Sequence, residues 1–195
     1  AWLLAFASPA AAQDAYPSKP VRLVVPFAPG GPADLIARIV GQKLSEELGK
    51  QFYIETHAGA GGNIGTGVTA RAPADGYTLA MGVANMITNP ILLPKVTKWK
   101  TSDFAGIGQI GAPPNVFVVA ANHPAKTLKD LVDYLKNNPS QSSVANPGFG
   151  TSNHLGQELF FHRTGLQVQN VMYKGQPEML PEGDDRTGIN QSFTL

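Results

Sequence analysis

The chain of 195 residues contains no cysteine. The absence of thiols excludes a disulfide framework, a cysteine nucleophile and a thiolate metal site. Charge is also scarce, because only 15% of the residues are charged and the formal net charge is +1. A nucleic-acid surface needs clustered lysine and arginine, and no basic run occurs in this sequence, so we expect no nucleic-acid partner.

The first thirteen residues carry no charge at all and end in an Ala-x-Ala pattern. Such an apolar stretch is typical of the later half of a secretory signal, here cleavable after Ala12. A membrane anchor is the alternative, but the stretch is too short to span a bilayer of ~30 Å. We interpret residues 1–13 as the remnant of a signal peptide whose start is missing, and we expect an exported, periplasmic protein.

Strand and helix patterns alternate along the chain, which is typical of a parallel α/β sheet with right-handed crossovers. Before residue 112, the expected elements are strands at 21–27, 52–55 and 77–82, a helix at 33–48 and a helix that opens near Gly62. In the helix at 33–48, an apolar stripe is expected to face the core; it consists of Leu35, Ile36, Ile39, Val40, Leu44 and Leu48.

A long extended stretch, residues 104–121, is interrupted by Pro113 and Pro114 and reads as a crossover between two lobes. We therefore predict a first lobe at residues 16–112 and a partial second lobe at 113–175. The second lobe is expected to contain a helix after a Thr127–Asp130 capping box, a strand at 143–145, a helix from Thr151 to about Arg163 and a strand at 168–173.

Residues 176–195 do not continue this alternation. Pro177, Pro181 and Gly183 exclude a long helix, and no apolar periodicity remains. We expect this tail to be poorly ordered, or to be a junction that belongs to no native fold.

Three glycine-rich turns, residues 26–34, 59–65 and 147–154, follow strands and open helices. The free N–H groups of a first helical turn and the positive end of the helix dipole favour an anion. Ligands of parallel sheets gather at the carboxyl ends of the strands, where these turns lie. Because the turns contain small polar groups and no nucleophile, they favour binding over catalysis.

Known nucleotide and hydrolase motifs are incomplete in these turns. The dinucleotide pattern that starts at Gly59 and Gly61 has Ile64 in place of its last glycine, and no phosphate-binding Gly-Lys-Ser/Thr loop occurs. The nearest approach to a hydrolase elbow, residues 150–154, lacks the final glycine, and capping of a helix explains Thr151 better. A small α/β enzyme that uses Asp34 or His154 as a base stays open as the alternative function.

His154, Glu158 and His162 are spaced four apart and share a helix face, but the two histidines lie ~12 Å apart, too far to bind one metal ion. The same helix is expected to turn Leu155, Leu159 and Phe160 toward the core, so that the polar stripe is its solvated face. We expect no metal.

Lys174 follows a predicted strand, and two roles stay open for it: a surface lysine, or a group that faces an anion. For Asp34, a dipole partner of its helix and a ligand contact also both stay open.

Several motifs occur together in an order typical of one family. Residues 16–31 (Tyr-Pro-Ser-Lys-Pro-Val-Arg-Leu-Val-Val-Pro-Phe-Ala-Pro-Gly-Gly), 59–65 (Gly-Ala-Gly-Gly-Asn-Ile-Gly) and 73–79 (Pro-Ala-Asp-Gly-Tyr-Thr-Leu) closely resemble the Bug family. These proteins are the extracytoplasmic solute receptors of tripartite tricarboxylate transporters. Pro114-Asn115, the turn at 148–155 and Tyr173-Lys174-Gly175 continue the match, which covers residues 16–175.

The resemblance implies an α/β, two-lobed periplasmic binding protein (type II, Venus-flytrap) that is incomplete at the C-terminus, because family members are longer. It implies a small carboxylate or related organic solute as ligand, no cofactor, no catalysis, a monomer, and the membrane components of the transporter as partners. The ligand-binding roles of the family fall by position on Phe27, Ala28, Pro29, Gly30, Gly31, Asp34, Gly62, Asn63 and Ile64, and with less specific motifs on Asn85, Asn115, Thr151, Ser152 and His154.

Overall fold

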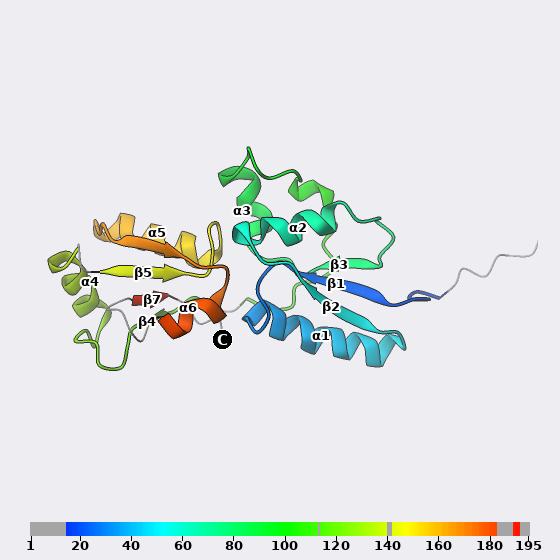
Figure 1. The fold of residues 1–195 in the computed structure, drawn as a ribbon, viewed down its shortest axis with the longest axis horizontal. Coiled ribbons are helices and arrows are strands. Elements are labelled where there is room, and N and C mark those ends of the chain that lie inside the picture. The colour runs from blue at the N-terminus through cyan, green and yellow to red at the C-terminus, as the bar shows by residue number, and fades with distance from the viewer. Residues whose placement is uncertain (1–14, 113, 140–141, 183–188, 192–195) are drawn as a thin grey trace, which may run out of the picture.

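A computed structural model of the protein describes residues 15–112, 114–139, 142–182 and 189–191. Its strands form two separate sheets, and the helices surround them in two groups (Figure 1). The first sheet has the strand order β2-β1-β3 and the second the order β4-β7-β5-β6. All described strands of the first sheet precede residue 113, and those of the second follow it. The expected signal remnant and Pro113 lie outside the described residues.

The first group follows the predicted alternation. It contains β1 (Val21–Val25), α1 (Pro32–Leu48), β2 (Phe52–Thr56), the short turn η1 (Ala60–Gly62), α2 (Asn63–Ala70), β3 (Thr78–Ala80), α3 (Asn85–Leu92) and the turn η2 (Thr101–Asp103). The three predicted strands and two helices are confirmed, with boundaries that differ by up to two residues. The helix α3, which includes Pro90, has no counterpart in the sequence prediction.

Strand β1 is the centre of the first sheet and pairs in parallel with β2 and β3. Parallel strands that are covered on both faces are continuously apolar, and all but Arg22 of β1 are buried. Helix α1 covers one face, where Leu23 and Val25 pack with Ala37, and α2 covers the other (Figure 1). This arrangement brings the turns after β1 and β2 to the same edge of the sheet.

The expected apolar stripe of α1 is only partly buried. Leu35 and Ile39 are more than half exposed, at 53% and 66%. The buried face contains the small residues Ala37 and Gly41 instead, which let the helix approach β2 closely. A Cβ added at Gly41 would lie 3.2 Å from Ile54 Cδ1. Close packing of α1 against β2 therefore requires small side chains at Ala37 and Gly41. A stripe of large apolar residues in the sequence does not reveal these positions.

The second group contains β4 (Phe117–Val118), α4 (Leu128–Asn137), β5 (Ser143–Asn146), α5 (Ser152–Thr164), β6 (Gln169–Met172), α6 (Gln176–Glu182) and β7 (Ile189–Gln191). The predicted capping box is confirmed, since the Asp130 N–H donates to Thr127 Oγ1 at 3.2 Å and the Thr127 N–H donates to Asp130 Oδ2 at 3.0 Å. Helices α4 and α5 share a core with Val144 of β5.

The prediction for the buried face of α5 is wrong for Leu155 and Leu159, whereas Phe160 is partly buried and packs against the core as predicted. Leu155 and Leu159 are exposed, whereas His154 and Gln157 are buried. The reason is pairing of amides inside the fold, because the Asn146 side-chain amide donates to Gln157 Oε1 and, at 2.6 Å, to Asn170 Oδ1. Hydrogen bonds inside the second group of elements thus allow polar side chains to occupy the inner face of α5.

The expectation of a tail without ordered structure is wrong for two segments. Helix α6 starts at Gln176, with Pro177 in its first turn where a missing N–H costs little, and Met179 is fully buried. Strand β7 lies between β4 and β5, antiparallel to β4 and parallel to β5. Both elements are too short to produce a periodic pattern, which explains why the sequence did not predict them. Residues 183–188 and 192–195 lie outside the described part of the chain.

Candidate functional site

The second and third glycine-rich turns meet between the two sheets. The backbone of the second turn, at Gly61, lies so close to the third turn that a Cβ at Gly61 would overlap the Phe149 carbonyl. Thr88 of α3 donates a hydrogen bond across this junction to the Gly150 carbonyl oxygen at 2.6 Å. The first turn approaches the start of α6, where a Cβ at Gly175 would lie 3.3 Å from Ala28 Cβ. The second and third turns, one from each group, therefore border one shared cleft.

The first turn joins β1 to α1. Gly31 is the N-cap in an extended conformation, and no side chain caps the helix. Gly30 has a φ of 79°, a left-handed conformation that favours glycine, and its N–H donates to Asp34 Oδ2 at 2.9 Å. The first-turn N–H groups of α1 are thus left for water or a ligand, as expected of an anion site.

Asp34 is only 2% exposed, and Arg38 Nε also donates to its Oδ2, at 3.0 Å. Burial raises the pKa of the Asp34 carboxyl. The hydrogen bonds from Arg38 and Gly30, together with the charge of Arg38, lower the pKa by a larger amount, so it lies below its ordinary value. The carboxylate stays charged and fixes the shape of the turn. Its internal hydrogen bonds fit a partner of the helix start better than a free base.

The second turn joins β2 to α2 and also lacks a side-chain cap. Gly61 and Gly62 both have positive φ, 59° and 83°. Asn85 is fully buried beneath the turn and donates to Thr66 Oγ1 at 3.3 Å, and Thr66 in turn donates to the Gly62 carbonyl at 2.9 Å. The Phe27 ring lies beside the same glycine, 3.4 Å from where its Cβ would be. The predicted residues Phe27, Gly62 and Asn85 are thus brought together.

The third turn, between β5 and α5, satisfies its own polar groups. Thr151 caps α5 by accepting from the His154 N–H at 3.3 Å and donates to the Gly148 carbonyl at 2.8 Å. The Gly150 N–H donates to His154 Nδ1 at 3.3 Å. Asn115 donates to the Ser152 carbonyl at 3.1 Å, which ties the turn to the segment before β4. Unlike the first two turns, this one has a side-chain cap at the start of its helix.

His154 is 7% exposed and stacks on Phe149, with ring centroids 4.6 Å apart. Burial lowers the pKa of His154, and the nearby Glu158 carboxylate opposes this only in part. The imidazole is therefore neutral near pH 7 and accepts from the backbone through Nδ1. It positions the turn and does not supply a positive charge to an anion.

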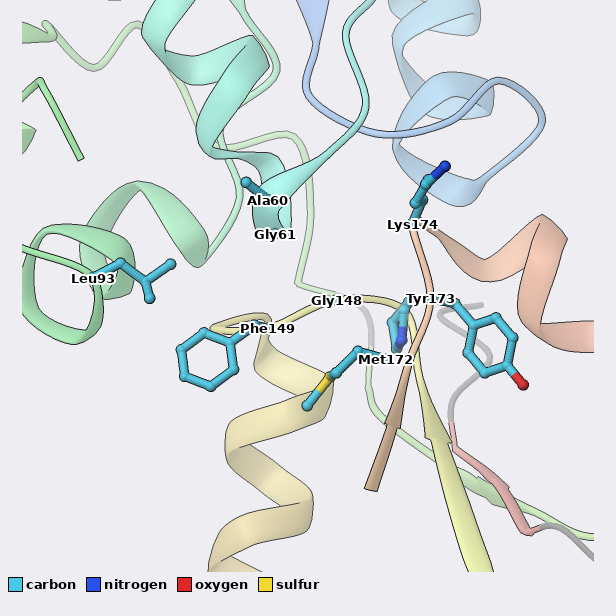
Figure 2. Close-up of a pocket in the computed structure, with 9 residues that line it drawn as sticks. Ala60, Gly61, Leu93, Gly148, Phe149, Met172, Tyr173 and Lys174 are labelled. Atoms are coloured by element: carbon cyan, nitrogen blue, oxygen red, sulfur yellow. The ribbon is translucent and has the colours of Figure 1, made fainter. Parts of the chain in front are cut away.

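The cavity between the two groups has a volume of about 300 Å³. Its described lining residues come from the second turn, the residue after α3, the third turn, and the end of β6 with the two residues that follow it. They are Ala60, Gly61, Leu93, Pro147, Gly148, Phe149, Met172, Tyr173 and Lys174 (Figure 2). Lys174 is the one charged residue among these nine. Its ammonium group points toward the connection between β1 and α1 (Figure 2).

None of the fourteen predicted ligand residues is among the nine described residues that line this cavity. The lining residues at the second and third turns lie one to four positions from predicted ones and could have been found from the same motifs. Leu93 and Met172 have no sequence signal, because Leu93 directly follows α3, Met172 ends β6, and neither belongs to one of the glycine-rich turns. Ile64 is half exposed on α2, and Ser152 is exposed on α5.

The structure contains no helix long and apolar enough to cross a membrane, within the residues that it describes. Among the same residues, no group of three or more histidine, aspartate or glutamate side chains could hold a metal ion. The pair of His154 and Glu158 has its closest atoms, Nε2 and Oε1, 3.7 Å apart.

Residues 36–183 match the family described as "Tripartite tricarboxylate transporter family receptor". The chain belongs to this family. The resemblance to Bug proteins is thereby confirmed, and the match extends into the tail that was predicted to be unmatched. Relatives include BugT of Bordetella pertussis, 34% identical over 164 residues, and an uncharacterised protein from the tcbD–tcbE intergenic region of Pseudomonas sp. strain P51, 36% identical over 162 residues. Both alignments cover 83% of this chain, and they cover 50% and 48% of the relatives.

Solved structures of the receptor family share the fold. A structure described as a periplasmic transporter has a TM-score of 0.86 and 37% identity and covers 91% of this chain and 60% of its own. A Rhodopseudomonas palustris protein with adipate has a TM-score of 0.82 at 34% identity, covering 86% and 56%. MatC from Rhodopseudomonas palustris, with bound malate, has a TM-score of 0.78 at 27% identity, covering 86% and 57%.

The α/β architecture of periplasmic solute-binding proteins that the sequence predicted is therefore confirmed. These relatives are solute-binding receptors rather than enzymes. The chain spans about half the length of the curated relatives that it matches.

Proposed function

We propose that this chain is the ligand-binding part of a periplasmic receptor that captures a small carboxylate for a tripartite tricarboxylate transporter. In this proposal the receptor is a monomer, it performs no chemistry on its ligand, and it delivers the ligand to the membrane components of the transporter. Residues 16–112 form the first lobe, and the second begins after residue 113.

One observation carries the proposal: two helix starts without side-chain caps, those of α1 and α2, lie at the same edge of the first sheet, and Ala60 and Gly61, just before α2, line the cavity. Uncapped first-turn N–H groups bind anions, and the cleft is bordered by a lysine. The relatives with adipate and malate carry carboxylates, which agrees with such a site.

The fourteen predicted residues divide into two roles in this proposal. Direct contacts come from Phe27, Ala28, Pro29, Gly30, Gly31, Gly62, Asn63, Ile64 and Ser152. Residues with hydrogen bonds inside the protein hold the turns in shape, namely Asp34, Asn85, Asn115, Thr151 and His154.

Calorimetric titration of the 195-residue chain with adipate and malate tests the receptor role. We expect saturable one-to-one binding of at least one acid, which a surface patch would not produce. Addition of salt should weaken it only modestly, because the anion is bound by backbone groups in a cleft. Absence of binding by any small carboxylate would contradict the proposal.

The enzyme alternative requires a free base, and both candidates are held by internal hydrogen bonds. This supports binding without chemistry. Incubation with a bound acid, followed by mass spectrometry of the solution, tests it directly. The acid should be recovered unchanged; conversion that is lost in a His154→Ala or Asp34→Asn variant would favour the enzyme.

A further inference from the structure

The cavity between the two sheets is polarised along its length. Three apolar side chains, Leu93, Phe149 and Met172, gather on one side of it, and Lys174 lies beyond them at the end of β6 (Figure 2). The backbone N–H of Lys174 donates to Glu178 Oε2 at 3.3 Å, which fixes the backbone at this end of the strand. One end of the cavity is therefore apolar and the other carries a cation.

The apolar end is not part of either hydrophobic core. Phe149 and Met172 are 37% and 40% exposed, and neither belongs to the two clusters of buried apolar residues. They come from different elements and converge with Leu93 from the opposite group. When an apolar ligand displaces water from such exposed apolar side chains, the apolar area removed from water makes the free energy of binding more favourable.

We propose that the cleft selects an organic acid with one carboxylate end and an apolar body of several carbons, over a compact hydroxy-diacid such as malate. This inference rests on the proposed receptor function and specifies its ligand class. The carboxylate lies toward Lys174, and the carbon chain lies against Phe149, Met172 and Leu93. A second carboxylate at the apolar end would be desolvated without a charged partner among the described lining residues, which is costly.

The test is calorimetry of the 195-residue chain with butyrate, hexanoate, octanoate and malate. Each buried methylene contributes about 0.8 kcal/mol, so hexanoate should bind about tenfold more tightly than butyrate. The heat-capacity change of binding should become more negative as the chain lengthens, because more apolar surface is buried. If octanoate binds no more tightly than hexanoate, the cavity of about 300 Å³ is already filled by the six-carbon acid.

Variants separate the two ends of the cavity. Met172→Asn and Phe149→Ser should weaken hexanoate binding about fivefold or more and butyrate binding by a smaller factor, whereas Ile107→Asn, on an exposed residue outside the cavity, should change neither. Lys174→Gln should weaken all the acids, and the exposed Lys50→Gln should not. Thermal melts without ligand verify that each variant folds.

The outcomes distinguish the two proposals. Affinity that rises with chain length and depends on Met172 supports the inference. Malate binding more tightly than hexanoate, with no effect of Met172→Asn, would overturn the ligand class and leave the receptor function standing. Failure of every acid to bind would overturn both.

Discussion

At the scale of single residues, the positions that shape the cleft are mostly held by backbone geometry. Gly61 combines a φ of 59° with a backbone contact to the opposite group. Glycine satisfies both demands at once, because it tolerates a left-handed conformation and has no Cβ. Substitutions can separate the left-handed conformation of Gly61 from its close contact with the opposite group.

We predict that Gly61→Ala weakens ligand binding by about tenfold, since the added Cβ overlaps the Phe149 carbonyl and overpacking typically costs about 1–3 kcal/mol. The matched control is Gly49→Ala. Gly49 has a similar φ of 67° but no atom within 4 Å of its Cβ position, so only backbone strain remains. Calorimetry should show normal affinity for Gly49→Ala; equal affinity of both variants would mean that the contact at Gly61 is unimportant for binding.

A second residue-scale prediction concerns pH. Burial lowers the pKa of His154 and, together with the charge of Lys126, that of His123. The unfolded chain, with histidine pKa values near 6.5, therefore binds more protons than the folded chain as pH falls below about 6.5. The free energy of unfolding should decrease as pH is lowered from about 7 to about 5.

Urea denaturation across this pH range checks the prediction. His154→Gln and His123→Phe should each flatten the profile, because the group that takes up a proton on unfolding is gone. A profile that is already flat in the unsubstituted chain would refute the argument.

At the scale of elements, local signals in the sequence are sufficient wherever one short motif determines the structure. The Gly49 end of α1 and the Thr127–Asp130 start of α4 were predictable for that reason. The outward face of α1 and the inward polar face of α5 were not, because they depend on how closely Gly41 approaches β2 and on the pairing of Gln157 with Asn146. Such partners are distant in the sequence.

The candidate site divides in the same way. The turns were predictable because glycine and a helix start are adjacent in sequence. Leu93 and Met172 were not, since they join the cleft only when the two groups of elements approach each other. Strand β7 was missed because three residues inserted between β4 and β5 carry no periodicity.

The capping box of α4 gives a prediction at this scale. Thr127→Ala removes the acceptor for the Asp130 N–H and should lower the free energy of unfolding by about 1 kcal/mol. The exposed Ser102→Ala serves as the control, because that side chain caps no helix. Chemical denaturation measures both, and an unchanged stability of Thr127→Ala would show that water replaces the cap without cost.

At the scale of the whole molecule, the proposed function requires that the two groups of elements move together when ligand binds. The hydrogen bond from Thr88 to the Gly150 carbonyl crosses the cleft and forms only when the groups are close. Binding of a ligand between them should therefore favour the compact state, as expected for closure around a shared site. We expect small-angle X-ray scattering to show a smaller radius of gyration when a bound acid is present.

Thr88→Val removes the cross-cleft donor while keeping the shape of the side chain. A hydrogen bond contributes about 1 kcal/mol, so ligand affinity should fall about fivefold, and the compaction on binding should be reduced. Thr101→Val is the matched control, because Thr101 donates to the Met86 carbonyl at 2.8 Å within the first group and crosses no cleft. If both variants bind and compact like the unsubstituted chain, the Thr88 bond does not stabilise the ligand-bound state, and closure must depend on contacts with the ligand itself.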